Sequence, residues 1–456
     1  MVPFVQELIP PPAVGETLSR FVEWENPVLF DSARRDRHGR YSFLTASPQE
    51  HFVIAKAEYG ADPFAEVRPA LARQPFHRID SLPPFQGGAA GLLAYELGAC
   101  WERLPSLPRS DRFPAAVIGI YDWTISWDHQ QGRAWLIVQS GKRSTELTRQ
   151  IQAQLAQPLP AASERLTPLE VCSTGSPLRS NFSEGEYLAA VERVIEYIRA
   201  GDIFQANLSQ RLTAPAPDSP LSTYLRLREV NSAPFAGYLA HGDWAVLSSS
   251  PERYLEAWGA EVYTRPIKGT RQRPSDPLLD LMQQDELRES GKDQAENVMI
   301  VDLLRNDLSR VCQPGTIRVS ELCTLETYAS VSHLVSEVAG TLREGCDFWD
   351  LLRASFPGGS ITGAPKIRAM EIIAELEQVP RQAYCGSLFY CSPDGVADSN
   401  LLIRTITWQN GQLTFPVGGG VVVDSQPHAE YAETWHKARG MLKAVGLSGL
   451  VLPERT

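Results

Sequence analysis

A change of composition at residues 141–180 is the feature that most constrains how this chain can fold. The segment is rich in Gln, Ser, Thr and Pro, and residues 158–163 show neither helical nor strand periodicity. We therefore interpret 141–180 as a linker between an N-terminal region, 1–140, and a longer region, 181–450. With 456 residues, 43% of them hydrophobic, the chain can form one very large domain or two closely packed ones.

Hydrophobic patterns predict different structure on the two sides of this linker. Before it, residues 41–44 and 134–138 are typical of strands, so the N-terminal region looks mainly β. After it, Ser183 and Glu186 form a capping box that opens a helix ending near Gly201. Further helices are expected at about 294–308, 364–376 and 430–445, and further strands at 244–248, 261–264, 399–407 and 413–423. The class is therefore α+β.

Residues 203–212 predict a strand with an unusually polar second face. Apolar and polar residues alternate there, so Gln205, Asn207 and Ser209 share one side. We expect that polar face to line a cavity.

Charge and cysteine content narrow the class of partner. The formal net charge is −11, which gives no basic footprint for nucleic acid. The seven cysteines are odd in number and contain no C-x-x-C pair, which suits a reducing compartment. The N-terminus lacks the pattern of a signal peptide, and no apolar run approaches the roughly 18 to 20 residues needed to span a bilayer. We expect a soluble cytoplasmic protein that binds neither nucleic acid nor membranes.

Two predicted helices carry acidic pairs at helical spacing. Glu430, Glu433 and Lys437 fall on one face, and Asp293 and Glu296 do so on another helix. Such carboxylates are ligands that Mg²⁺ prefers. On spacing alone, a solvated helix surface is the commoner explanation.

Two glycine-rich runs offer backbone N–H groups to an anion. Residues 356–366 lack the ending of a phosphate loop, which disfavours a nucleotide, but Pro365 suits a helix start that would bind a carboxylate. Residues 418–420 are three glycines after a strand, which allow close approach of a ligand or simply form a bulge.

Lys268 and His333 are the remaining candidates for chemistry. Lys268 lies in a segment bounded by proline and glycine, where a lowered pKa would make it a nucleophile. His333 is a candidate acid or hydrogen-bond donor. Taken singly, a loop lysine is usually solvated, and a buried histidine usually has a structural role.

Together these segments resemble the chorismate-utilising enzymes, a family that contains component I of anthranilate synthase and of aminodeoxychorismate synthase, and the isochorismate and salicylate synthases. The resemblance spans 181–445, and the N-terminal region resembles its counterpart too. It implies large antiparallel sheets sandwiched with flanking helices, an active site in the cleft between them, and neither a glutaminase nor a lyase domain fused on. The motifs lie at 202–209, 250–253, 265–270, 296–307, 333–336, 358–370 and 424–437.

Two positions discriminate within the resemblance. Members that add water carry a lysine base where this chain has Gln205, so isochorismate and salicylate synthesis are disfavoured. Anthranilate synthases typically have alanine where this chain has Lys268, whereas aminodeoxychorismate synthases have lysine. The resemblance therefore implies amination of chorismate at C4 without loss of pyruvate, in para-aminobenzoate and folate biosynthesis.

The resemblance also implies a role for each matching residue. Lys268 attacks C2 as the C4 hydroxyl leaves, Glu252 donates the proton, His333 supports it, and ammonia then expels the lysine. A bound Mg²⁺, held by Glu296 and Glu433 with Asp293 and Glu430 nearby, orients the ring carboxylate. The residues implied to bind substrate are Gly269, Thr270, Ser360, Thr362, Gly363, Tyr384, Arg404, Gly418, Gly419, Gly420 and Lys437. A direct attack by ammonia on C4, with Lys268 acting only electrostatically, is the alternative.

Two partners beyond chorismate are implied by the same resemblance. Free ammonia is scarce at neutral pH, which implies a separate glutaminase subunit that supplies it. Residues 29–32 and 231–236 are similar to the tryptophan pocket of anthranilate synthase, with Ser32, Pro234, Phe235 and Ala236 as the candidate contacts. Asp31 and Ala236 depart from the usual motif, so retained tryptophan and simple packing both stay open.

Two other functions compete with this interpretation. The nearest is component I of anthranilate synthase, which releases pyruvate and an aromatic amine. The other is a non-catalytic scaffold or tryptophan-sensing subunit. The presence of Glu252, Lys268, Glu296 and Glu433 together argues against the second, because a chain without catalysis has no need of an acid and a cation site.

Overall fold

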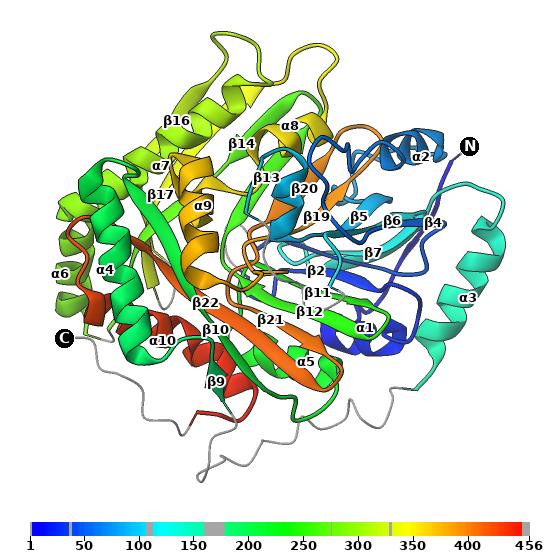
Figure 1. Ribbon diagram of the computed structural model, residues 1–456. Helices are drawn as coiled ribbons and strands as arrows, with labels where there is room; N and C mark the ends of the chain where they lie inside the picture. Colours follow the sequence, from blue (N-terminus) through cyan, green and yellow to red (C-terminus); the bar gives the residue numbers. More distant parts are fainter. Residues whose placement is uncertain are drawn as a thin grey trace.

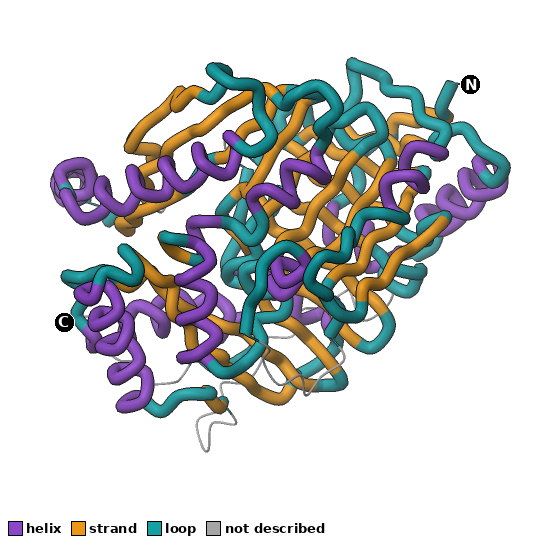
Figure 2. Tube along the Cα trace, turned by 45° about the horizontal axis from the view of Figure 1, so that its top comes forward, coloured by secondary structure: helices purple, strands orange, loops and turns teal. Residues whose placement is uncertain are grey.

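Two large antiparallel sheets face each other in the computed structural model, and helices cover their outer sides (Figures 1 and 2). Residues 2–35, 39–105, 113–158, 178–274, 276–327 and 331–448 are described. The first sheet has 12 strands in the order β1-β8-β7-β3-β2-β11-β12-β21-β22-β10-β18, with β9 beside β10. The second has 10, ordered β15-β17-β14-β13-β20-β19-β5-β6-β4, with β16 beside β17. The expected α+β sandwich is confirmed.

The strands of the first sheet are β1 (Phe4–Glu7), β2 (Val28–Asp31), β3 (Tyr41–Thr45), β7 (Trp123–Asp128), β8 (Arg133–Val138), β9 (Arg179–Ser180), β10 (Gln205–Pro215), β11 (Phe235–His241), β12 (Trp244–Ser250), β18 (Gly363–Ala364), β21 (Thr405–Gln409) and β22 (Gln412–Val421). Those of the second are β4 (Glu50–Ile54), β5 (Gly88–Leu93), β6 (Ala116–Tyr121), β13 (Arg253–Trp258), β14 (Glu261–Thr264), β15 (Ile267–Gln272), β16 (Arg318–Thr327), β17 (Val331–Thr341), β19 (Ser387–Cys391) and β20 (Ala397–Asn400). Regions before and after the predicted linker therefore share both sheets.

The helices are α1 (Val14–Phe21), α2 (Val67–Arg73), α3 (Ser144–Ala156), α4 (Glu184–Ala200), α5 (Pro220–Val230), α6 (Pro277–Glu289), α7 (Gly291–Ser309), α8 (Phe348–Ser355), α9 (Lys366–Glu377) and α10 (Pro427–Ala444), with 3₁₀ turns η1 (Tyr95–Cys100) and η3 (Gly359–Ile361). An aromatic and aliphatic core that includes Phe43, Phe85 and Tyr390 fills the space between the sheets. The outer cores pack α1, α3, α5 and α10 on the first sheet and α2, α7 and α8 on the second. Burial of apolar area in these layers holds the two sheets together.

The capping box predicted for α4 is confirmed. The Ser183 hydroxyl accepts from the Glu186 backbone N–H at 3.3 Å, and the Glu186 carboxylate accepts from the Ser183 N–H at 2.7 Å. Gly201 ends the helix with a φ of 84°, as expected for a residue in the left-handed region. One apolar side of α4 packs with α9 against β10, which anchors the strand that carries Gln205 and Asn207.

Three predicted elements need correction. Residues 144–156 of the expected linker form α3, because Leu147 and Ile151 bury one side of it; residues 159–177 lie outside the described chain. The strand expected at 399–407 is two strands in different sheets, joined where Arg404 takes a φ of 51°.

The third correction concerns the helix expected from residue 364. It begins at Lys366, because Pro365 disfavours a helical conformation for the residue before it, and Gly363–Ala364 pair with β10 instead.

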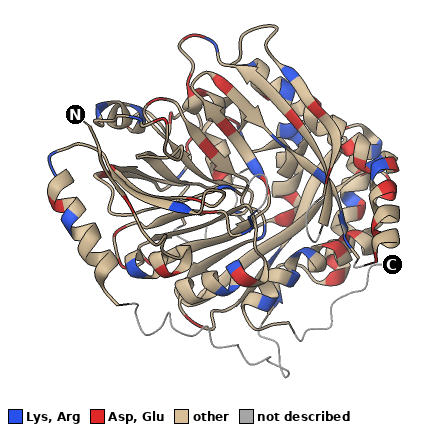
Figure 3. Ribbon diagram, turned by 180° about the vertical axis from the view of Figure 1, so that it is seen from behind, with Lys and Arg blue, Asp and Glu red and all other residues tan. Residues whose placement is uncertain are grey.

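Charge, membrane and thiol features can be stated for the described residues. Acidic and basic side chains are interspersed over the ribbon (Figure 3). No described helix combines the length and apolar character needed to cross a membrane. Six cysteines have free thiols, and Cys172 lies outside the described chain.

Candidate active site

Lys268 owes its position to a bulge in β15. The register against β17 shifts between Lys268 and Thr270, and Gly269 at the bulge has a φ of 69°. A Cβ at Gly269 would stand 2.8 Å from Leu287 and 3.0 Å from Asp293, so a side chain there is excluded by both conformation and space. Thr270 is also a predicted site residue, but its side chain lies outside the described part of the structure.

Ser360 joins Lys268 to Glu252. The Lys268 Nζ donates to the Ser360 carbonyl at 3.1 Å, and the Ser360 hydroxyl donates to Glu252 Oε1 at 2.9 Å. Glu252 lies just before β13 and is only 5% exposed. Residues far apart in the sequence therefore place a carboxyl group and an amine on one hydroxyl-bearing turn.

Burial shifts both ionisable groups towards their neutral forms. It raises the pKa of Glu252, although Lys268 and the Ser360 hydrogen bond oppose the shift. It lowers the pKa of Lys268, against the opposing charges of Glu296 and Glu252. A protonated carboxyl and an uncharged amine are the states that a general acid and a nucleophile require.

The predicted acidic pairs face each other from two helices. Lys292 on α7 reaches Glu430 on α10 at 3.8 Å, which links the helices that carry Glu296 and Glu433. Burial raises the pKa values of Glu296 and Glu430, and neighbouring carboxylates add to this: Asp293 and Glu430 for Glu296, and Glu433 for Glu430. Mutually repelling carboxylates are the arrangement that a divalent cation would relieve.

Existing bonds already hold part of this acidic set. The Ser425 hydroxyl donates to Glu430 at 2.6 Å, Lys437 pairs with Glu433 at 2.8 Å, and Arg271 lies 3.3 Å from Asp293. Within the described residues, no three His, Cys, Asp or Glu side chains are close enough together to hold a metal ion. The carboxylates are therefore bound to neighbouring cations and a hydroxyl rather than gathered around one point.

The three glycines of β22 bring this strand close to both β10 and α10. A Cβ at Gly419 would stand 3.3 Å from Glu430, 3.5 Å from Glu433 and 3.6 Å from Lys437. A Cβ at Gly420 would overlap the Gln205 amide at 1.9 Å, and the Gly418 carbonyl accepts from Lys437 at 2.8 Å. The close approach seen here is to side chains and backbone of the protein, and the predicted approach to a ligand stays a prediction.

The predicted substrate-binding residues of the Gly358–Gly363 turn do not all face the site. Ser360 faces Glu252, whereas the Thr362 hydroxyl donates to the Gly358 carbonyl at 3.0 Å and is fully buried. Gly363 lies against β10, where a Cβ would meet the Gln205 carbonyl at 2.1 Å. Thr362 therefore holds the turn that presents Ser360.

Arg404 lies near Arg34 of the N-terminal region, and Tyr384 lies beside Arg381. Burial lowers the pKa of Arg404, and the nearby charge of Arg34 adds to this effect. Among the described residues the Arg404 guanidinium has no ion-pair partner within salt-bridge distance. A half-buried cation of this kind favours an anionic ligand. Tyr384 is buried, and its ring centroid lies 5.7 Å from the Arg381 guanidinium.

His333 supports the bulge rather than carrying charge. It pairs with Thr270 across the β17–β15 ladder and forms a hydrogen bond with the Gly269 backbone. Burial, with the charges of Arg404 and Arg34, lowers its pKa to about 4. At neutral pH it is therefore an uncharged hydrogen-bonding group.

Comparisons with known proteins identify the family of the chain. Residues 25–443 match the chorismate binding enzyme family. The chain belongs to this family. It is 42% identical over 386 residues to aminodeoxychorismate synthase component 1 of Escherichia coli strain K12, covering 84% of this chain and 82% of that protein. It is 39% identical over 431 residues to anthranilate synthase component 1 of Thermus thermophilus, covering 92% of each. The crystal structure of anthranilate synthase component I from Streptococcus pneumoniae superposes with a TM-score of 0.78 at 28% identity, covering 90% of this chain and 93% of that one.

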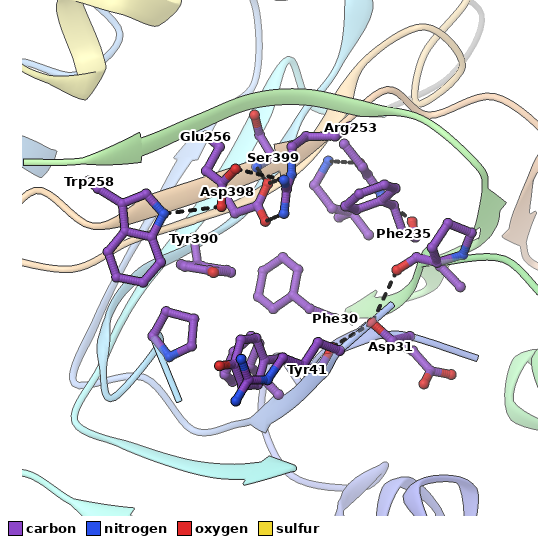
Figure 4. Close-up of a pocket in the computed structure, with 18 residues that line it drawn as sticks. Phe30, Asp31, Tyr41, Phe235, Arg253, Glu256, Trp258, Tyr390, Asp398 and Ser399 are labelled. Carbon is purple, nitrogen blue, oxygen red and sulfur yellow. Dashed lines mark hydrogen bonds and ion pairs between the residues drawn. The ribbon is translucent and has the colours of Figure 1, made fainter. Parts of the chain in front are cut away.

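This member of the chorismate binding family also has a cavity of about 250 Å³ between the sheets (Figure 4). Ser32, Pro234, Phe235 and Ala236 all line it, so the four residues predicted as tryptophan contacts are brought together. Figure 4 shows Phe30 and Tyr390 among the aromatic residues that surround the space.

Charged residues that line this cavity are already paired with each other or with neighbouring residues. Arg253 binds Asp398 at 2.9 Å and Glu256 at 2.6 Å. Asp31, which departs from the usual motif, accepts from Tyr224 at 2.9 Å and from Arg228 at 2.6 Å. Its carboxylate therefore serves the contact between β2 and α5.

Sequence patterns missed several residues that shape the site. Arg381 and Glu377 form a buried ion pair behind it at 2.6 Å, and Ser425 holds Glu430. Arg381 lies in a loop that shows no hydrophobic periodicity. Its sequence separation from Glu377, four residues, equals about one helical turn. That i, i+4 separation was the only available signal.

Proposed function

We propose that this chain aminates chorismate at C4 with ammonia to give 4-amino-4-deoxychorismate, in the cytoplasm. The observation that carries the proposal is the Lys268–Ser360–Glu252 arrangement, in which a partly buried amine and a buried carboxyl contact one turn. Relatives of about 40% identity named aminodeoxychorismate synthase component 1 support it.

The two groups supply a complete proton balance for the reaction. Uncharged Lys268 bonds to C2 while the C4 hydroxyl leaves as water, taking its proton from Glu252. Ammonia then bonds to C4 as the Lys268 nitrogen leaves C2 with its electron pair. The excess proton on the new amine returns to Glu252, so both groups regain their starting states.

Charge in the site suits a substrate with two carboxylates. Arg404, whose guanidinium has no ion-pair partner among the described residues, would bind the enolpyruvyl carboxylate, with Tyr384, Lys437 and the backbone of 418–420 beside it. Gly269 and Gly363 would contact the ring through their backbone, since protein atoms already fill the space where a side chain would stand at each.

The ring carboxylate requires a cation on the acidic side. Glu296 and Glu433 would hold Mg²⁺, with Glu430 and Asp293 beside them, since burial and mutual repulsion of these carboxylates fit a hard divalent ion. When bound, the ion would neutralise the ring carboxylate and fix the orientation of the ring. Lys292 and Lys437 would have to release their carboxylates.

Ammonia would come from a partner. The names of the relatives contain the words component 1, which supports a second, glutaminase component that releases ammonia from glutamine.

The cavity of about 250 Å³ between the sheets would hold L-tryptophan. Its indole would lie among Phe30, Phe235 and Tyr390, and its ammonium near Glu256.

Anthranilate synthesis is the second candidate, because a relative with that name is 39% identical over 92% of the chain. Lys268 disfavours it, since a lysine bound at C2 blocks the amination there that an aromatic ortho-amine requires.

Product identification separates these activities. The full chain is incubated with chorismate, ammonium chloride and MgCl₂, and products are identified by mass spectrometry. We expect 4-amino-4-deoxychorismate without pyruvate, and loss of turnover in EDTA that added Mg²⁺ restores. Fluorescent anthranilate with pyruvate would establish the second candidate, and unchanged chorismate would indicate a non-catalytic protein.

A further inference from the structure

Lys366 ends the glycine-rich run 356–366, and no step of the proposed reaction uses it. It is the first residue of α9, and its side chain is only 12% exposed. Its Nζ donates to Asp307 of α7 at 2.6 Å and to the carbonyl of Ser355, the last residue of α8, at 2.6 Å. Three helices, all labelled in Figure 1, therefore meet at one buried ammonium group.

The contact with Ser355 closes the segment that carries Ser360. Ser355 and Lys366 flank residues 356–365, here called the Ser360 turn, so their hydrogen bond joins the two ends of this turn. The last carbonyls of a helix have no partner within the helix, and a cation beside them also meets the negative end of the helix dipole. Lys366 therefore fixes the separation of the two ends of the Ser360 turn.

The contact with Asp307 connects the same turn to α7. This helix also carries Glu296, one of the carboxylates proposed to hold Mg²⁺. The turn packs tightly on the helix, because a Cβ at Gly359 would stand 2.6 Å from Leu303. The ion pair of Lys366 and Asp307 thus joins the turn on the amine side of the site to the helix on the metal side.

Hydroxyl groups link this junction to the strands near Glu252 and Lys268. The Tyr254 hydroxyl donates to the Ser355 hydroxyl at 2.9 Å, and both residues are buried. Tyr254 lies two residues after Glu252, and its carbonyl accepts from the Thr264 hydroxyl at 2.7 Å. Thr264 ends β14, four residues before Lys268. The junction therefore contacts the chain on both the acid side and the amine side.

Stability alone does not account for a charged pair at this place. Two charges lose their hydration on burial, and neutral or apolar side chains of similar volume often stabilise a protein equally well. Asp307 is 4% exposed, so its carboxylate is largely removed from water. An ammonium group differs from an apolar side chain in that its N–H donors fix two oxygen acceptors relative to each other.

We infer that Lys366 is a positioning residue for amination. Through its two hydrogen bonds it holds the Ser360 turn in register with the helix that carries Glu296. The inference rests on the proposed function. Loss of the two bonds would shift the amine and the carboxyl relative to the metal side of the site without removing any reacting group. A misplacement of about 1 Å can lower a rate about 10²-fold.

The test replaces the ion pair by neutral side chains of similar shape in the full chain, as Lys366→Met/Asp307→Asn. Lys366→Met alone would leave a buried carboxylate without its partner and would lower stability for that reason. The matched control is Arg226→Met/Asp218→Asn. Arg226 pairs with Asp218 at 2.7 Å and donates to the carbonyl of Ala444, the last residue of α10, at 2.8 Å. It binds an aspartate and a helix end as Lys366 does, but where α5 and α10 pack on the first sheet.

Three quantities are measured for each double variant. The first is the urea midpoint of unfolding, and the second is the pair of steady-state constants for chorismate with ammonium chloride and MgCl₂. The third is hydrogen exchange of the amides of residues 358–363 by mass spectrometry. The Ile361 and Thr362 amides donate to carbonyls within the turn at 3.4 Å and 3.3 Å, so their exchange reports its opening.

In Lys366→Met/Asp307→Asn, kcat should fall about 10- to 10²-fold, while the KM for chorismate stays within about threefold because every substrate-binding group is still present. Exchange of residues 358–363 should become about tenfold faster. The Arg226→Met/Asp218→Asn control should keep kcat, KM and the exchange rate of this segment.

A kcat within about twofold of that of the unaltered chain would overturn the inference, as would an equal loss of kcat in the control. A rise in KM at constant kcat would also contradict it, because Lys366 would then act in substrate binding. Absence of product from the unaltered chain would instead refute the proposed function. Hydrogen exchange would still test the contact in that case, since an unchanged rate for residues 358–363 would show that Lys366 does not hold the turn.

Discussion

The site around Lys268 and the cavity around Tyr390 differ in how their charged groups are paired. In the first, burial pushes Glu252 and Lys268 towards neutral states, and the Arg404 guanidinium has no ion-pair partner among the described residues. In the second, Arg253 is neutralised by Asp398 and Glu256, and those carboxylates raise its pKa despite its burial. The first arrangement suits proton transfer and anionic substrates, whereas the second suits binding without chemistry.

Replacing the amine should have the largest effect. Lys268→Ala removes the nucleophile, and we expect amination to fall at least about 10³-fold, since residues that act as a unit with a general acid lose most of the rate together. The measurement is steady-state product formation with ammonium chloride. Lys443→Ala, on the exposed side of α10, is the control and should keep the rate.

Removing the proton donor should cost less. Glu252→Gln keeps the shape and the contact with Ser360 but cannot donate the proton to the C4 hydroxyl, so kcat should fall about 10²- to 10⁴-fold. The KM for chorismate should change little, because the group acts on the leaving hydroxyl. A larger change in KM than in kcat would show that Glu252 binds substrate instead.

His333, which lines a small cavity between the two regions, should make stability depend on pH. Its pKa is about 4 in the folded protein and 6.5 in the reference state, so the unfolded chain binds the proton more tightly. The contribution of His333 to the free energy of unfolding is complete above about pH 6.5. It falls by about 3 kcal/mol as the pH falls towards 4.

The His333 effect is measured by urea unfolding at several pH values. His333→Gln should flatten this acid slope, whereas His428→Gln, with a side chain 72% exposed, should retain it. An unchanged slope in His333→Gln would show that other groups cause the acid sensitivity.

The smallest effect concerns tryptophan. Glu256→Gln should weaken binding of L-tryptophan about tenfold in calorimetric titration, because it removes the negative charge nearest the proposed ammonium position. Glu261→Gln, more exposed on the next strand, should bind as the unaltered chain does. Absence of any binding by the unaltered chain would leave the cavity a packing feature.

Local signals predicted much of this architecture. The capping box of α4 and the strand-like alternation of β10 depend only on neighbouring residues, and both were found. The broken strand at 399–407 was missed because its two halves belong to different sheets, and sheet membership is set by long-range pairing. The same holds for α3, whose helix depends on Leu147 and Ile151 reaching a core that other segments build.

Sequence motifs predicted which residues form the candidate site, but they did not predict which of these residues contact each other. Lys268, Glu252 and Ser360 were named from their segments, but their common contact at one turn required the fold. The buried ion pair of Arg381 and Glu377 could not be anticipated, because burial is a property of the folded chain. Whether the four carboxylates bind Mg²⁺ stays a prediction.

Intact-protein mass spectrometry of the chain with chorismate and MgCl₂, without ammonia, tests the central role of Lys268 most directly. We predict a covalent adduct of chorismate less one water, mapped to Lys268 by peptide analysis and absent in Lys268→Ala. Added ammonia should discharge it as 4-amino-4-deoxychorismate. Full-rate amination with no adduct, or amination undiminished in Lys268→Ala, would contradict the account.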